Sequence, residues 1–160
     1  MRKLSREEEQ YFISVVKEVC SQSRLAQSKA FCQHGSTSVY THSLKVAYAS
    51  YRLAVGWRLP VNPYELIRGA LLHDYFLYDW HDREHQHRRP HGFYHPGAAL
   101  ENARRDFTLT RREENIIRRH MFPLTAVPPK YLEAWLVCVV DKICSLRETV
   151  RTGDSADKKE

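Results

Sequence analysis

The sequence lacks any long hydrophobic run. No stretch approaches the roughly 18 consecutive apolar residues that cross a bilayer. The N-terminal segment, MRKLSREEEQ, lacks the apolar region of a signal peptide. We therefore expect a soluble, cytoplasmic protein with no membrane association.

Cysteine is also scarce. The chain has four cysteines and no C-x-x-C pair. That number is small for a disulfide scaffold in a chain of this length, so we expect reduced and mostly buried thiols. No repeat of fixed period occurs, and a solenoid is therefore not indicated.

The sequence does contain enough apolar material for a folded core. Hydrophobic residues make up 42% and aromatic residues 11% of the 160 residues, which argues against a disordered chain. We expect a single domain over residues 1–151 and a mobile, charged tail over residues 152–160. The formal net charge of +6 favours anionic partners, among which nucleotides, phosphate esters and nucleic acids all qualify.

Helix signals recur along the chain and strand signals do not. Capping boxes at Ser5 with Glu8 and at Thr110 with Glu113, and an N-cap at Asn62, mark three helix starts. Apolar residues at helical spacing predict helices over about residues 6–22, 24–32, 39–55, 64–76, 96–107, 110–120 and 130–150, with a polar, histidine-rich loop over 79–94. The expected fold class is all-α, a bundle of about six to seven helices.

The unusual feature is the presence of polar side chains within apolar helical faces. His42 shares a helical face with Val39 and Val46, and Asp141 interrupts the most hydrophobic segment of the chain, AWLVCVVDKIC. Burying such groups costs free energy unless a partner compensates them. The groups that point inward or stand at a helix start are His42, His73, Asp74, His95, His120 and Asp141.

Any one of these residues has an ordinary explanation, such as a hydrogen-bonded core histidine or a carboxylate paired with an arginine. The whole set, drawn from five separate segments, is better explained by divalent metal ions. Neutral imidazole and carboxylate are ligands that Fe, Mn, Zn, Ni and Co accept. The absence of thiolate ligands favours a hydrolytic or oxygen-activating site over a structural zinc site.

These residues resemble the HD-domain superfamily of metal-dependent phosphohydrolases. The resemblance consists of His42, then His73-Asp74 within RGALLHDYFLYDW, then Asp141 within VVDKIC, and it spans about residues 34–148. It implies an all-α HD-domain bundle in which these four residues hold a divalent metal. It also implies that Asp74 bridges to a second metal where one is present.

Two further histidines make the sequence similar to the dinuclear members of that superfamily. His95 and His120 lie between the His-Asp pair and Asp141, where those members supply ligands for a second ion. The implied cofactor is two divalent transition-metal ions of Fe, Mn, Zn, Ni or Co. Similar ligand sets occur in diadenosine tetraphosphate hydrolases, cyclic-dinucleotide phosphodiesterases and HD-fold di-iron oxygenases. The Gly-Tyr-Pro signature of the phosphodiesterases is missing, which disfavours that assignment.

The implied function is hydrolysis of a phosphoester in a nucleotide, dinucleotide or small phosphorylated metabolite by a metal-bound hydroxide. The expected catalytic residues are Asp74, His73 and Lys45. Lys45, one turn after His42, is also expected to contact the substrate phosphate. Loop residues with groups that suit an anion complete the expected substrate site: Arg83, Arg88, Arg89 and His91.

Three alternatives are compatible with parts of the sequence. A di-iron oxygenase can use the same ligands on the same fold. A basic nucleic-acid-binding module is suggested by charge alone, but the arginines of residues 104–119 fall at positions typical of a solvated helical face, without a nucleic-acid-binding motif. A regulatory domain without turnover is disfavoured by the complete ligand set.

Overall fold

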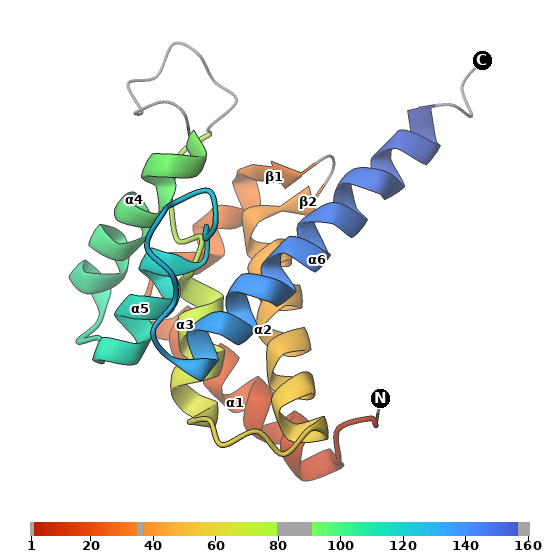
Figure 1. The fold of residues 1–160 in the computed structure, drawn as a ribbon, viewed down its shortest axis with the longest axis vertical. Helices are drawn as coiled ribbons and strands as arrows, with labels where there is room; N and C mark the ends of the chain where they lie inside the picture. The colour runs from red at the N-terminus through yellow and green to blue at the C-terminus, as the bar shows by residue number, and fades with distance from the viewer. Residues whose placement is uncertain (1, 35–36, 80–90, 157–160) are drawn as a thin grey trace.

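The computed structural model describes residues 2–34, 37–79 and 91–156. Within these ranges the chain forms six α-helices, one 3-10 helix and one two-stranded hairpin. The elements in chain order are α1 Arg6–Gln22, η1 Leu25–Ala30, β1 Cys32–His34, β2 Thr37–Ser38, α2 Val39–Gly56, α3 Pro63–Leu72, α4 His91–Asp106, α5 Arg111–Arg119 and α6 Leu132–Ala156 (Figure 1). The predicted all-α bundle of six to seven helices is confirmed.

Three helices start where the sequence predicts because side chains satisfy their first free N–H groups. Ser5 Oγ accepts a hydrogen bond from the Glu8 N–H, and the Glu8 carboxylate accepts one from the Ser5 N–H. Thr110 and Glu113 form the same reciprocal pair at the start of α5. Asn62 caps α3 through its side-chain oxygen.

The segment before α2 differs from its prediction. The helix expected over residues 24–32 is the 3-10 helix Leu25–Ala30, followed by strand β1, which pairs antiparallel with β2. Strands of three and two residues are too short to show an alternating pattern, so the hairpin was not predicted. The sequence also predicts a turn over residues 35–38; residues 37–38 form strand β2 instead, and residues 35–36 lie outside the described residues.

The end of α3 falls earlier than expected. The helix ends at Leu72 rather than near Phe76, so His73 and Asp74 lie in the turn that follows it. The apolar pattern continues past this point because Tyr75 and Phe76 are buried beside the turn. Periodicity alone therefore extended the predicted helix too far.

The start of α4 and the end of α6 also differ. Helix α4 begins at His91, so the loop predicted to Tyr94 and the helix start predicted at Pro96 were wrong. A proline costs a helix one backbone hydrogen bond, and α4 continues through it. Helix α6 runs to Ala156, beyond the end predicted near Val150. Residues 80–90 of the predicted loop and 157–160 of the predicted tail lie outside the described ranges.

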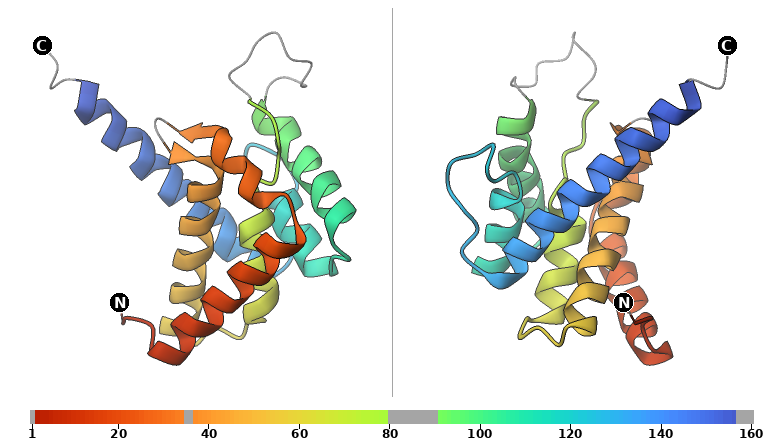
Figure 2. Two further views of the ribbon diagram at one scale, coloured as in Figure 1. Left: turned by 180° about the vertical axis from the view of Figure 1, so that it is seen from behind. Right: turned by 45° about the vertical axis from the view of Figure 1, so that its right-hand side comes forward.

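Helix α3 lies at the centre of the bundle. It contacts α1, α2 and α5, and α6 packs across α2 and α5. Helices α1 and α6 lie on opposite faces, as the front and rear views show (Figure 1, Figure 2). The apolar core contains side chains from all of these helices, including Val19, Leu66, Ile116 and Val137. None of the helices in the described ranges combines the length and the hydropathy needed to cross a membrane.

Helices α3 and α5 approach each other closely at Gly69. A Cβ atom added at this position would lie 2.5 Å from Ile116 Cδ1 and 3.2 Å from Ile116 Cβ. Ile116 is completely buried, so it cannot move without displacing other core atoms. Glycine therefore sets the distance between two helices whose C-terminal caps are His73 and His120.

Gly69→Ala is expected to destabilise the protein by about 1–3 kcal/mol, because overpacking outweighs a gain of about 1 kcal/mol in helix propensity. Gly97→Ala in α4 is the matched control, since an added Cβ there meets no atom within 4 Å. The control is expected to leave stability unchanged or to raise it. Urea denaturation compares the two variants with the parent chain, and equal stability of the variants would contradict the close packing.

Candidate metal centre

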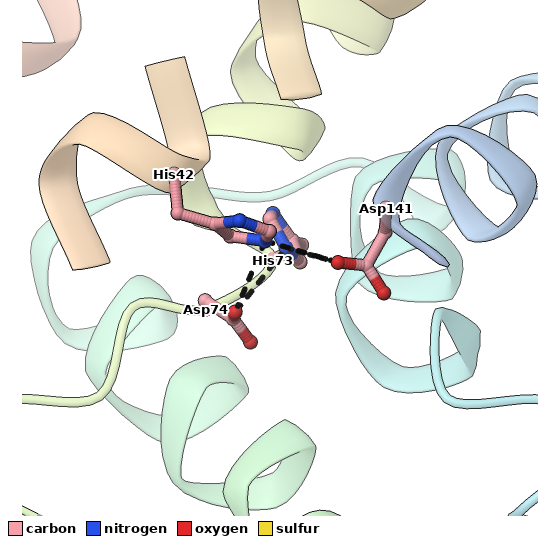
Figure 3. Close-up of side chains that lie close together, drawn as sticks. All are labelled: His42, His73, Asp74 and Asp141. Atoms are coloured by element: carbon pink, nitrogen blue, oxygen red, sulfur yellow. Dashed lines mark hydrogen bonds and ion pairs between the residues drawn. The ribbon is translucent and has the colours of Figure 1, made fainter. Parts of the chain in front are cut away.

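Four of the predicted residues form one cluster. His42 lies in α2 and Asp141 in α6, while His73 and Asp74 follow α3. One nitrogen or oxygen atom from each lies within 4.8 Å of the corresponding atoms of the others. Asp141 Oδ1 is 3.0 Å from His42 Nε2 and 3.6 Å from His73 Nε2 (Figure 3). All four side chains are buried, so the cluster forms part of the protein interior.

A second cluster adjoins the first. His95 lies in α4 and His120 caps the C-terminal end of α5. Their Nε2 atoms are 2.8 Å apart, and both face Asp74 Oδ1, at 3.0 Å from His95 and 3.4 Å from His120. Both histidines are buried.

Asp74 joins the two clusters through different oxygen atoms. Its Oδ2 atom faces His73 Nε2 at 3.3 Å and His42 Nε2 at 3.8 Å. Its Oδ1 atom faces the pair formed by His95 and His120. A carboxylate placed in this way can bind one ion with each oxygen.

Two of the histidines are oriented by backbone carbonyl groups. His73 Nδ1 lies 2.7 Å from the Ala70 carbonyl oxygen, and His120 Nδ1 lies 2.8 Å from that of Ile117. A carbonyl oxygen only accepts hydrogen bonds, so each Nδ1 atom carries the proton. When such a ring is neutral, as binding a metal requires, its Nε2 atom presents a lone pair to the clusters.

The clusters contain polar atoms that other protein groups do not satisfy. His73 Nε2 and Asp74 Oδ1 are buried and lack a well-aligned hydrogen-bond partner among the described residues. Their nearest charged or polar neighbours are the histidines and aspartates of the same two clusters, at 3.0–3.6 Å. Unsatisfied buried atoms of imidazole and carboxylate groups fit the ligand preferences of divalent transition metals.

Without metal, the first cluster holds protons tightly. Burial alone would lower the pKa of His42, but hydrogen bonds with Asp141 and Glu148 outweigh it and raise that pKa to about 9. Burial likewise opposes ionisation of Asp141, yet the nearby His42 and His73 hold the pKa of its carboxyl well below the usual range. The cluster therefore retains both a carboxylate and a protonated imidazole near neutral pH.

In the second cluster the pKa of a histidine is shifted in the opposite direction. Burial lowers the pKa of His120 below its ordinary value, and the Asp74 carboxylate only partly opposes that effect. Burial would raise the pKa of Asp74, but the charges of His73 and His95 keep it well below its ordinary value. A neutral His120 beside an ionised Asp74 is ready to bind a cation without first losing a proton.

Two residues outside the predicted set, Glu148 and Gln33, support the clusters. Glu148 Oε2 lies 2.9 Å from His42 Nδ1, and its other oxygen accepts a hydrogen bond of 2.8 Å from Lys45 Nζ. Gln33 Nε2 donates to Asp74 Oδ2 at 2.5 Å. Glu148 follows Asp141 by two helical turns on the same face of α6, and this spacing can be recognised in the sequence. Gln33 comes from the unpredicted hairpin and had no such signal.

A cavity of about 730 Å³ opens beside both clusters. Its lining combines polar side chains with the apolar Met121, Pro123 and Leu124. Lys142 Nζ donates to the His120 carbonyl oxygen at 2.7 Å and lies 3.3 Å from that of Cys138. The described lining residues are Gln33, Asp74, Gly92, His95, His120, Met121, Pro123, Leu124, Asp141, Lys142 and Ser145.

Only some of the expected substrate-binding residues lie in the part of the chain that the structure describes. Lys45 binds Glu148 and does not belong to the described lining of the cavity, so its expected contact with phosphate stays a prediction. Arg83, Arg88 and Arg89 lie outside the described residues. His91 is the first residue of α4, and its side chain is not among those described.

Metal-free protein is expected to lose on the order of 3 kcal/mol of stability between pH 6.5 and 9, because the folded pKa of His42 is about 9 against an ordinary value of 6.5. A raised folded pKa stabilises the fold below the unfolded pKa, and that contribution disappears as the pH rises through the folded pKa. A bound metal must displace the proton, so metal-loaded protein should gain stability over the same range.

Thermal unfolding of chelator-treated and metal-reconstituted protein across this range measures both trends. Glu148→Gln is the matched variant, because it removes one of the charges that raise the pKa of His42 and should flatten the metal-free profile. A flat profile for the metal-free parent chain would contradict the assignment.

Comparison with known proteins places the chain in a family. The family model described as HD domain matches residues 39–146, which is more than half of the chain and includes all six clustered residues. Comparisons with curated proteins and with solved structures give no match. The matched region, with its helical bundle and its buried cluster of histidines and aspartates, shows that the chain belongs to the HD domain family.

Proposed function

We propose that this HD domain is a metal-dependent phosphohydrolase that cleaves a phosphoester of a nucleotide, dinucleotide or small phosphorylated metabolite. The observation that carries the proposal is the position of Asp74 between two clusters of potential ligands, with one oxygen toward each. Two-ion sites bridged by a carboxylate are suited to phosphoryl chemistry, since they act on both the attacking and the leaving oxygen.

The clustered residues would divide between two ions. His42, His73 and Asp141 would hold the first ion with Asp74, and His95 and His120 would hold the second with the same carboxylate. Bound divalent ions lower the pKa of water toward neutrality and offset negative charge on a phosphoryl group.

The protein itself supplies orientation and charge. The Ala70 and Ile117 carbonyl groups fix the rings of His73 and His120, which limits the reorganisation needed when a ligand binds. The Gln33 amide donates a hydrogen bond to Asp74 Oδ2, the oxygen that faces the first cluster, and so helps to hold the carboxylate. These contacts support a site whose geometry exists before substrate arrives.

The residues that line the cavity suit a phosphorylated substrate. Lys142 provides a cation beside both clusters, and its contacts with the His120 and Cys138 carbonyl groups hold the ammonium group in place. Met121, Pro123 and Leu124 add an apolar part to the lining, suited to a less polar part of the substrate. In the proposed binding mode, the phosphate lies against the clusters and Lys142.

Asp74→Asn is expected to abolish metal retention and to lower phosphate release at least about 100-fold, because changing even a residue that only orients a ligand typically costs 10- to 100-fold. Elemental analysis and a phosphate-release screen over nucleotides, dinucleotides and sugar phosphates measure the two effects. The matched control is Glu9→Gln, which removes an exposed carboxylate on α1 and should change neither.

An active, metal-free Asp74→Asn protein would overturn the proposal. Oxygen consumption coupled to one substrate, without phosphate release under anaerobic conditions, would instead assign the chain to the oxygenases that share this fold.

Lys142→Met is expected to keep the metal and to lower kcat/KM about 10- to 100-fold, which corresponds to the loss of one hydrogen bond to a charged group. Lys17→Met, on the exposed face of α1, is the control for removal of a lysine charge. Metal content is measured in parallel, so that a disturbed His120 is recognised. An unchanged kcat/KM would remove Lys142 from the substrate site.

A further inference from the structure

The outer face of α6 is apolar along most of its length. Six large hydrophobic side chains on this helix are between 40% and 66% exposed. We call them the α6 stripe: Leu132, Trp135, Val139, Ile143, Leu146 and Val150.

The stripe is a single continuous surface. Its members are three or four residues apart, and at about 100° per residue they fall within a sector of roughly 80°. The opposite face of the helix is also apolar and buried, with Val137 in the core and Asp141 in the first cluster. A helix that is apolar on both faces is expected to be covered on both.

The position of α6 leaves the stripe accessible in the described structure. The helix crosses the outside of the bundle, and its C-terminal part extends beyond the other helices (Figure 1, Figure 2). Val139, Ile143 and Leu146 lie in the middle of the stripe and are 50%, 43% and 66% exposed. An exposed apolar surface of this kind marks an interaction site.

We propose that the stripe binds the same stripe of a second copy of this chain, with the two α6 helices antiparallel around a two-fold axis near residue 141. A two-fold contact requires a surface that matches itself when it is reversed. The stripe has this property, because its members pair at almost equal distances from residue 141. The pairs are Leu132 with Val150, Trp135 with Leu146, and Val139 with Ile143.

Size and charge agree with this arrangement. The largest side chain, Trp135, faces Leu146 of the other copy, so no two bulky rings meet. No charged residue lies within the sector of the stripe, so the centre of the seam is apolar in both copies. The paired length, from Leu132 to Val150, is about 27 Å.

Pairing would also restrain the helix that contributes residues to the metal centre. The inner face of α6 carries Asp141, 3.0 Å from His42, and Glu148, 2.9 Å from the same ring. A second copy that covers the outer face would hold this helix against α2. The proposal itself rests only on the stripe and does not depend on the proposed hydrolase activity.

Sedimentation of the full chain at about 1–100 μM tests the proposal. The parent chain is expected to have twice the mass of one chain, and Leu146→Glu to have the mass of one chain, because burying an unpaired carboxylate in the seam is costly. Ile13→Glu is the matched control, since Ile13 is 49% exposed on α1, on the opposite face of the bundle. It should remain dimeric.

A charge pair tests the antiparallel register. Trp135→Lys and Leu146→Glu should each give a monomer, whereas the double variant should regain the dimer, since each lysine then faces a glutamate of the other copy. Circular dichroism confirms that each variant is folded. A parent chain that stays monomeric at 100 μM, or a Leu146→Glu protein that stays dimeric, would overturn the proposal. A folded double variant that stays monomeric would overturn the antiparallel register.

Discussion

The Asp74 carboxylate is buried with four imidazole rings within 3.8 Å, and so many ionisable groups can be buried together only where their charges and lone pairs are compensated. This requirement connects the fold to its function. Helices α2, α4 and α6 each bring one side chain to the carboxylate or its neighbours, and the ends of α3 and α5 bring the others. The close contact at Gly69 fixes the spacing of those two ends.

Much of this arrangement could be predicted from the sequence, because strong local signals and the global fold agree. Capping residues such as Ser5 and Thr110 marked helix starts, and polar residues within apolar faces or at a helix start marked the six clustered groups. The hairpin could not be predicted, because its strands are too short to show a pattern. For the same reason Gln33 was missed, and Glu148 was missed because it reads as an ordinary charged residue near a helix end.

Helix α6 links three properties of the molecule. Its inner face contributes Asp141 to the first cluster and Glu148 to the support of His42. One edge contributes Lys142 to the cavity, and its outer face carries the α6 stripe. The apolar character that makes AWLVCVVDKIC unusual in the sequence therefore serves the core on one side and, in our proposal, a second copy on the other.

Anomalous X-ray diffraction from crystals of metal-reconstituted protein tests the proposed two-ion centre most directly. Two peaks are expected, one between His42, His73, Asp141 and Asp74, and the other between Asp74, His95 and His120. Their separation should be about 3.5–4 Å, as in other two-metal sites. A single peak away from Asp74, or no peak after reconstitution with Fe, Mn, Zn, Ni or Co, would contradict the assignment of Asp74 as the bridging ligand.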